Sequence, residues 1–138
     1  MPAYILKTEP STYSFDDLVR DKQTVWDGIS NPVALKHLRA VKKGDTLLIY
    51  HSGEQKSVVG FARAASAAYQ DPQVADPKRV VIDIVAGKPV PEPVTLAQFR
   101  ADAVLKGTDL VRLSRLSVIP LTDAQLARVK KLGGVKEK

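Results

Sequence analysis

The chain has 138 residues, of which 44% are hydrophobic and 26% charged, an ordinary composition for one globular domain (residues 1–138) with a real core. It has no cysteine, no secretory leader at its start and no apolar run of the roughly 18 residues that cross a membrane, so disulfides, thiolate metal sites and membrane insertion are excluded and a cytoplasmic protein is expected. The net charge is +6, but much of this excess falls in the last eleven residues, a basic tail expected to fray from about residue 133.

Strand-forming residues and the breakers between them predict five β-strands. The predicted strands are residues 3–8, 46–51, 57–68, 79–85 and 116–120. Gly60 is expected to bend or bulge the third strand, and Gly87 with the prolines that follow is expected to end the fourth. Residues 24–30 are predicted to be irregular, and two Asp-Pro steps predict a loop over 69–77.

Four helix starts are visible as capping residues. Ser14 begins a short helix that reaches about Arg20, and Asn31 precedes a proline at the first helical position of a second helix. Thr95 and Thr122 each stand three residues before a glutamine, which is the capping-box pattern. Since strands and helices do not alternate as βαβ units, the fold class is α+β, with a strongly bent antiparallel or mixed sheet and short helices covering its openings.

The segment after the first strand carries Lys7, Thr8 and Glu9. Because side chains alternate along a strand, Lys7 and Glu9 could share one face and act together in a site. A weak surface ion pair between them is the alternative.

The only tryptophan lies in Trp26-Asp27-Gly28. A tryptophan in a loop beside a glycine that permits close approach is suited to stack on a flat ligand, although it could equally cap the core. Polar groups of Tyr50, His51 and Ser52 would lie at the mouth of the bent sheet, where a strand ends.

Arg115 to Ser117 alternate polar and apolar residues near the last strand. Arg115 could bind phosphate, stack on a base, or pair with an acid such as Glu9 or Asp27. A basic group that could contact phosphates consists of Lys36, Arg39, Lys42 and Lys43. No cofactor fingerprint or nucleophile motif is present, and the two histidines lack the spacing of metal ligands, so neither cofactor nor metal is expected.

Seven short motifs in order, spread over residues 3–132, make the chain resemble the EVE domain family. These motifs are Tyr4–Pro10, Tyr13–Leu18, Trp26–Asn31, Leu38–Asp45, Tyr50–Ser52, Val59-Gly60 with Tyr69–Pro72, and Ser114–Pro120. The resemblance implies a PUA-like fold, related to YTH and ASCH domains, with a pocket for a base that has swung out of its strand. It implies a non-enzymatic module that binds DNA or RNA, with modified cytosine in DNA as the favoured ligand.

Carried over by position, the resemblance implies a pocket with four parts. These are Lys7, Thr8 and Glu9; Trp26, Asp27, Gly28 and Asn31; Tyr50, His51 and Ser52; and Arg115, Leu116 and Ser117. The chain departs from the family where polar residues are common, with Val33, Leu35, Leu113 and Ile119. Apolar residues at a pocket rim should change hydrogen-bond discrimination.

Two other functions fit parts of this pattern. The four apolar residues could mark a protein-interaction domain with a vestigial pocket. Lys7, Thr8 and Glu9 are also the residue types with which some ASCH relatives hydrolyse modified nucleosides, although a threonine between two strand neighbours should point away from them. A monomer is expected in each case.

Overall fold

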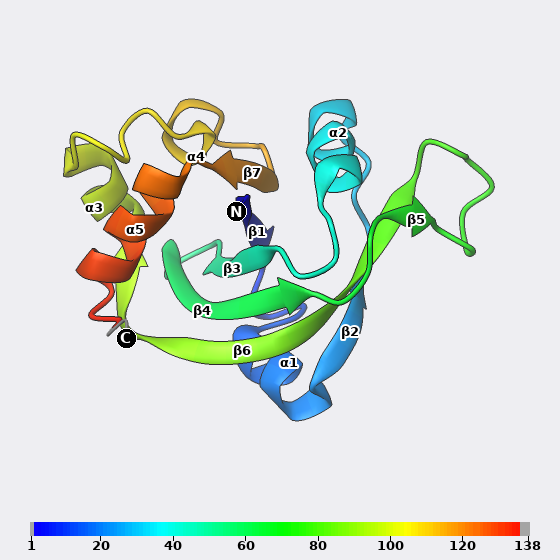
Figure 1. Ribbon diagram of the computed structural model, residues 1–138, viewed down its shortest axis with the longest axis horizontal. Coiled ribbons are helices and arrows are strands. Elements are labelled where there is room, and N and C mark those ends of the chain that lie inside the picture. Colours follow the sequence, from blue (N-terminus) through cyan, green and yellow to red (C-terminus); the bar gives the residue numbers. More distant parts are fainter. Residues whose placement is uncertain (1, 136–138) are drawn as a thin grey trace.

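The sheet and its helices are defined by a computed structural model that describes residues 2–135 (Figure 1). The strands are β1 (Ala3–Thr8), β2 (Gln23–Trp26), β3 (Thr46–His51), β4 (Ser57–Ala64), β5 (Tyr69–Gln70), β6 (Val80–Thr95) and β7 (Val118–Leu121). The helices are α1 (Phe15–Asp21), α2 (Pro32–Ala40), α3 (Leu96–Ala101), α4 (Asp109–Arg112) and α5 (Asp123–Leu132).

The strands form one strongly bent mixed sheet in the order β2-β6-β4-β3-β1-β7, with β5 paired to β6 outside this path. β1 and β3 run parallel, and the other neighbours are antiparallel. Figure 1 shows β4 and β6 as long curved ribbons that sweep under β3. The predicted α+β class and the bent mixed sheet are therefore confirmed.

The core follows the central strands. Ala3 to Leu6 of β1 and Leu47 to Tyr50 of β3 are all buried, because both strands have covered faces on each side. Parallel strands that are buried on both faces are continuous hydrophobic runs, which matches these two segments. Their carboxyl ends therefore lie side by side, with Lys7 opposite Tyr50 and Thr8 opposite His51.

The helices begin where the capping residues predict. Ser14, Thr95 and Thr122 each complete a capping box, and the Asn31 side chain accepts hydrogen bonds from the N–H groups of Val33 and Ala34. Figure 1 shows α3, α4 and α5 together at one end of the sheet, α2 beside β7, and α1 below β6. Nowhere in residues 2–135 is a helix long and apolar enough to cross a membrane.

The prediction that β6 ends near Gly87 is wrong. β6 continues through Pro89, Pro91 and Pro93, and its later residues pair with β4 on one edge. Proline has no backbone N–H and cannot donate a hydrogen bond to a neighbouring strand. β2 pairs with β6 no further than Val85, and the pairing of β4 with β6 shifts register on both sides of Gly60, so the ladder is interrupted on both edges where the prolines lie.

Four smaller predictions also need correction. Gln23–Trp26 is a strand rather than irregular chain, β4 ends at Ala64 rather than residue 68, and Tyr69–Gln70 pairs with β6 at the start of the predicted loop. The last strand starts at Val118, two residues later than predicted. No helix was predicted where α4 lies. Each short strand depends on a partner distant in sequence, which local propensity does not contain.

The predicted basic tail lies partly within the described chain. Gly133 caps α5 and its carbonyl accepts a hydrogen bond from the Glu92 N–H at 3.0 Å. The Val135 N–H donates to the carbonyl of Lys130. Residues 136–138 lie outside the described residues.

Gly60 is required by close packing, and its replacement should destabilise the fold. The predicted bulge is present, with β4 shifting register on both sides of Gly60. A Cβ at this position would overlap the ring of Phe15, so Gly60→Ala should lower the free energy of unfolding by about 1–3 kcal/mol in urea titrations.

The matched control is Gly107→Ala, because a Cβ there meets no atom within 4 Å. We expect that variant to stay within about 0.5 kcal/mol of the parent. The double variant Phe15→Leu with Gly60→Ala should lose less than the sum of the two single changes. Equal stability of the Gly60 and Gly107 variants would refute the packing explanation.

A phenol–carboxylate hydrogen bond joins β5 to β6 and sets a pH dependence. The Tyr69 hydroxyl donates to Asp83 at 2.6 Å, and this bond raises the pKa of Tyr69 from its ordinary value of 10.0 to about 12. Because the folded pKa exceeds the unfolded one, the stabilisation is complete below pH 10 and is lost as the pH rises through about 12. Asp83→Asn should move tyrosinate formation at residue 69 to lower pH, measured as the ultraviolet difference from Tyr69→Phe. An unchanged titration would contradict this assignment.

Candidate functional site

A hollow of about 530 Å³ opens beside the carboxyl end of β1. Its walls come from the end of β1, the turn before α1, the end of β2 with the following loop, and the segment before β7. The lining residues are Lys7, Thr8, Glu9, Thr12, Tyr13, Thr24, Val25, Trp26, Asp27, Gly28, Ile29 and Ser117. We call it the Trp26 hollow. It lies within the range of about 300–1,000 Å³ that is usual for small-ligand sites.

Lys7 is held by two interactions at the wall of this hollow. Its ammonium donates to the carbonyl of Ser114 at 2.7 Å and lies 5.8 Å from the centre of the Tyr50 ring. Its backbone N–H donates to the carbonyl of Ser117 at 3.0 Å. Partial burial lowers the pKa of Lys7, because desolvation disfavours the charged form.

Thr8 and Glu9 are occupied by other partners. The Thr8 hydroxyl donates to the carbonyl of Tyr13 at 2.7 Å, and the Glu9 carboxylate accepts from the backbone and hydroxyl of Ser11. Lys7 and Glu9 do not form an ion pair within residues 2–135. The three consecutive residues therefore share one hollow without contacting one another through their side chains.

Trp26 belongs to both the core and the hollow. Its side chain is only 7% exposed, and the Tyr13 ring meets it edge to face with centroids 6.2 Å apart. The alternative that Trp26 caps the core is therefore confirmed, and its stacking on a flat ligand stays a prediction. Gly28 follows with φ of +78° and space around its Cα, so the chain turns sharply beside the ring.

Asp27 presents an unpaired carboxylate. It is exposed at the wall of the Trp26 hollow, and among residues 2–135 its side chain makes no hydrogen bond or ion pair. A carboxylate in this position can accept hydrogen bonds from the amino group of a ligand.

Three predicted residues lie outside the lining of the hollow. Tyr50 and His51 are buried, since β3 is an interior strand, and Ser52 donates its N–H to the carbonyl of Thr8. The Phe15 N–H donates to Nε2 of His51 at 2.9 Å, which leaves Nδ1 to donate to Gln55. The ring of Tyr50 packs against the Lys7 ammonium, and His51 accepts a hydrogen bond from the first residue of α1.

A second hollow, of about 410 Å³, takes in three other predicted residues. It is lined by Asn31, Val33, Arg112, Leu113, Ser114, Arg115 and Leu116. The Asn31 carbonyl oxygen caps α2, Arg115 is exposed, and Leu116 is buried. Arg115 pairs with neither Glu9 nor Asp27 in the described chain, so that structural alternative is wrong.

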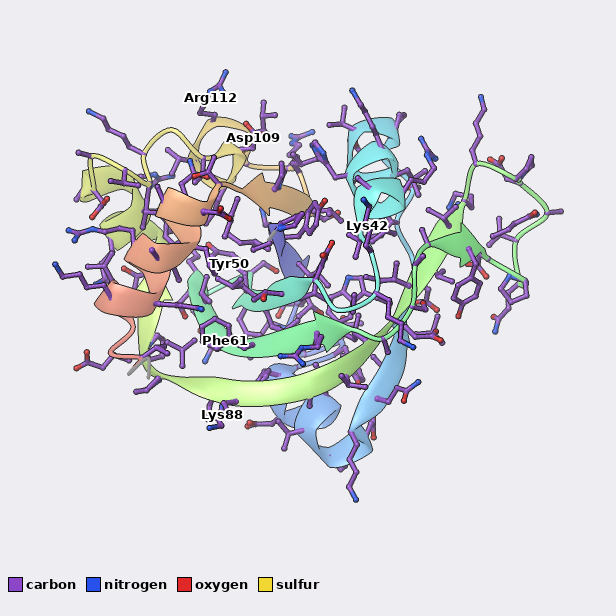
Figure 2. The ribbon with its side chains drawn as sticks, in the orientation of Figure 1. Lys42, Tyr50, Phe61, Lys88, Asp109 and Arg112 are labelled. Atoms are coloured by element: carbon purple, nitrogen blue, oxygen red, sulfur yellow. The ribbon has the colours of Figure 1, made fainter. Side chains whose placement is uncertain are left out.

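None of the predicted basic residues lines either hollow. Lys36, Arg39, Lys42 and Lys43 are all exposed on α2 and the turn after it, and Figure 2 shows Lys42 where α2 leads toward β3. A third hollow, of about 570 Å³, lies over β4 and β6 and includes Phe61 and Lys88 but no predicted residue (Figure 2). Residues 2–135 contain no grouping of histidine, aspartate and glutamate that could hold a metal ion.

The sequence interpretation missed five lining residues of the Trp26 hollow, namely Thr12, Tyr13, Thr24, Val25 and Ile29. Tyr13 carried a signal, since it opens the second motif of the family resemblance. Thr24 and Val25 reach the hollow because β2 pairs with β6, and local sequence does not contain this pairing.

Comparison with known proteins identifies the family. The model of the EVE domain matches residues 3–132. The chain belongs to the EVE domain family. This confirms the resemblance noted in the sequence, over the same residues.

Relatives of known structure share the fold closely. The NMR structure of Rpa0253 from Rhodopseudomonas palustris is 39% identical, covers 100% of this chain and 97% of its own, and has a TM-score of 0.93. Human THYN1, crystallised with 5-methylcytosine-containing DNA, is 25% identical with full coverage of both chains and a TM-score of 0.89. Mouse thymocyte nuclear protein 1 is 28% identical over 88% of this chain and 69% of its own length.

The fold extends to the wider PUA-like group. An ASCH protein from Zymomonas mobilis superimposes with a TM-score of 0.59 over 94% of each chain at 13% identity, a likeness that concerns the fold alone. The predicted PUA-like architecture of this EVE domain is therefore confirmed.

The His51 contact leads to a test of its structural role. His51→Leu removes the acceptor of the buried Phe15 N–H and should lower the free energy of unfolding by about 1–3 kcal/mol in denaturant titrations. His37→Leu is the control, because this half-buried histidine on α2 has no hydrogen-bond partner in the described chain. Equal losses in the two variants would show that the contact contributes nothing.

Proposed function

We propose that the Trp26 hollow accommodates a base that has swung out of a nucleic-acid strand, and that modified cytosine in DNA is its preferred ligand. The observation that carries this proposal is the pairing of an aromatic ring with the unpaired Asp27 carboxylate in one hollow. The homologous human THYN1, crystallised with 5-methylcytosine-containing DNA, supports the class of ligand.

The energetics of such a site are consistent with its residues. Extruding a base from its stack costs a few kcal/mol. Contact with aromatic side chains returns about 1–3 kcal/mol per base, and Trp26 with Tyr13 supplies it here. Carboxylates accept hydrogen bonds from the exocyclic amino group of cytosine, a role for which Asp27 is free.

The proposed module binds without catalysing a reaction. A nucleophile and its base must lie within hydrogen-bond reach of each other. Instead, the Thr8 hydroxyl and the Lys7 ammonium both donate to backbone carbonyls, of Tyr13 and Ser114. These contacts support a structural role for Lys7 and Thr8 at the wall rather than the chemistry of a hydrolase.

Phosphates along the bound strand would contact the exposed basic residues of α2 and the turn that follows it. These are Lys36, Arg39, Lys42 and Lys43. Such contacts add affinity that falls with salt and carry no base selectivity.

The test compares oligonucleotides that differ in one base, as DNA and as RNA, at two salt concentrations. The bases are cytosine, 5-methylcytosine, 5-hydroxymethylcytosine, adenine and N6-methyladenine, and binding is measured by fluorescence anisotropy. We expect saturable binding with a preference for a modified cytosine, strongest in DNA. Asp27→Ala should weaken that binding by about 10- to 100-fold, because a hydrogen bond to a charged group is lost.

Asp16→Ala is the matched control, since Asp16 is an exposed acid of α1 outside the hollow. Trp26→Phe tests the aromatic wall, because Trp26→Ala would open a core cavity and destabilise the fold by about 3–5 kcal/mol. Binding that ignores the modification, Asp27→Ala and Trp26→Phe alike would show that only the basic surface contacts nucleic acid, and would refute the proposal.

A further inference from the structure

The second hollow, between the start of α2 and residues 112–116, has a composition of its own. Val33 and Leu113 both line it, and each remains 47% exposed although valine and leucine are usually buried. Arg112 and Arg115 lie at the same hollow, and no acidic residue lines it. It therefore combines aliphatic walls with positive charge.

The four apolar residues that differ from the family pattern fall into two groups, one buried and one exposed. Leu35 and Ile119 are buried in the core, at 4% and 0% exposure, and contribute to packing. Val33 and Leu113, far apart in sequence, meet only at the second hollow. Their exposure is therefore concentrated at a single place rather than scattered over the surface.

The segment from Ser114 to Ser117 lies between the second hollow and the Trp26 hollow and contributes residues to both. Leu116 lines one hollow and its neighbour Ser117 lines the other. Lys7, in the wall of the Trp26 hollow, donates to the carbonyl of Ser114 in the wall of the second at 2.7 Å. A strand whose base occupies the Trp26 hollow can therefore place a neighbouring nucleotide over this segment and into the second hollow.

We propose that the second hollow is a subsite for the nucleotide next to the extruded base on the same strand. This inference rests on the proposed function of the Trp26 hollow. The sugar and base of the flanking nucleotide contact Val33 and Leu113, and Arg115 contacts the phosphate that joins the two nucleotides. The chain then recognises an extruded base within a strand of at least two nucleotides and binds a free nucleoside poorly.

The charges support a nucleotide rather than a peptide or a second copy of this chain. Arg115 is exposed and has no ion-pair partner in the described chain, and its planar fork of donors suits a phosphate. Arg112 forms an ion pair with Asp109 at 3.6 Å. Figure 2 shows the Arg112 side chain projecting outward from α4. Arg115 is therefore the better single change for a test.

The test uses NMR titration of the ¹⁵N-labelled full chain with three probes. These are 5-methyldeoxycytidine, the dinucleoside monophosphates that place thymidine on its 5′ or 3′ side, and the corresponding ribonucleotides. We expect the nucleoside to shift amide signals of the Trp26 loop alone. One of the two dinucleotides should also shift the amides of residues 112–116 and bind at least about tenfold more tightly.

Two matched pairs of variants test which residues produce the higher affinity for the dinucleotide than for the nucleoside. Val33→Thr keeps the shape and adds a hydroxyl, and Val19→Thr makes the same change on α1 at an equal exposure of 47%. Arg115→Gln removes the charge, and Arg63→Gln removes an exposed arginine of β4. The gain of the dinucleotide over the nucleoside should fall below about threefold in Arg115→Gln and decrease in Val33→Thr, while both controls keep it.

The outcomes separate the two proposals. Equal affinities for nucleoside and dinucleotide, with no shift at 112–116, would overturn the subsite and leave the base-binding function intact. A dinucleotide gain that survives Arg115→Gln and Val33→Thr would also overturn it and assign the second hollow to another occupant. Absence of any shift in the Trp26 loop with every probe would overturn both.

Discussion

The pairing of β1 with β3 on one side and β7 on the other is the interaction on which the rest of the structure depends. Ile5 and Leu6 are fully buried between these partners, so β1 cannot shift without exposing the core. Its carboxyl end therefore presents Lys7 at a fixed place, where its backbone and ammonium groups bind the carbonyls of Ser117 and Ser114. A hollow built on a rigid strand is preorganised, which reduces the entropy lost when a ligand binds.

Trp26 links ligand binding to stability. Its ring packs against the core and Tyr13, and the same residue lines the hollow. The free energy of unfolding of a small domain is only about 5–15 kcal/mol. Trp26 contributes about 3–5 kcal/mol of packing, so few replacements of this residue would keep the fold stable. Asp27, which is exposed and lacks such packing, is free to vary with the ligand while the fold is kept, whereas the positive φ of Gly28 favours glycine.

The EVE fold persists while much of the sequence changes. Relatives at 39% and 25% identity superimpose almost equally well, with TM-scores of 0.93 and 0.89. The four apolar residues that differ from the family pattern form two groups. Leu35 and Ile119 fill the core, and Val33 and Leu113 lie exposed at the second hollow. Core positions tolerate hydrophobic exchange when volume is conserved, whereas an exposed aliphatic pair changes what a surface can bind.

Local signals in the sequence determined the helix starts, the strands β1 and β3, the bulge at Gly60 and the family, because caps, propensities and motifs act over a few residues. Only the tertiary structure decided that β6 passes through three prolines, since that requires a stretch in which the pairing with neighbouring strands is interrupted. It also decided that Tyr50 and His51 support the site from the core instead of lining it. Which side chains meet in a hollow depends on pairings between residues far apart in the chain, such as Lys7 with Ser114, and such pairings leave no trace in local sequence.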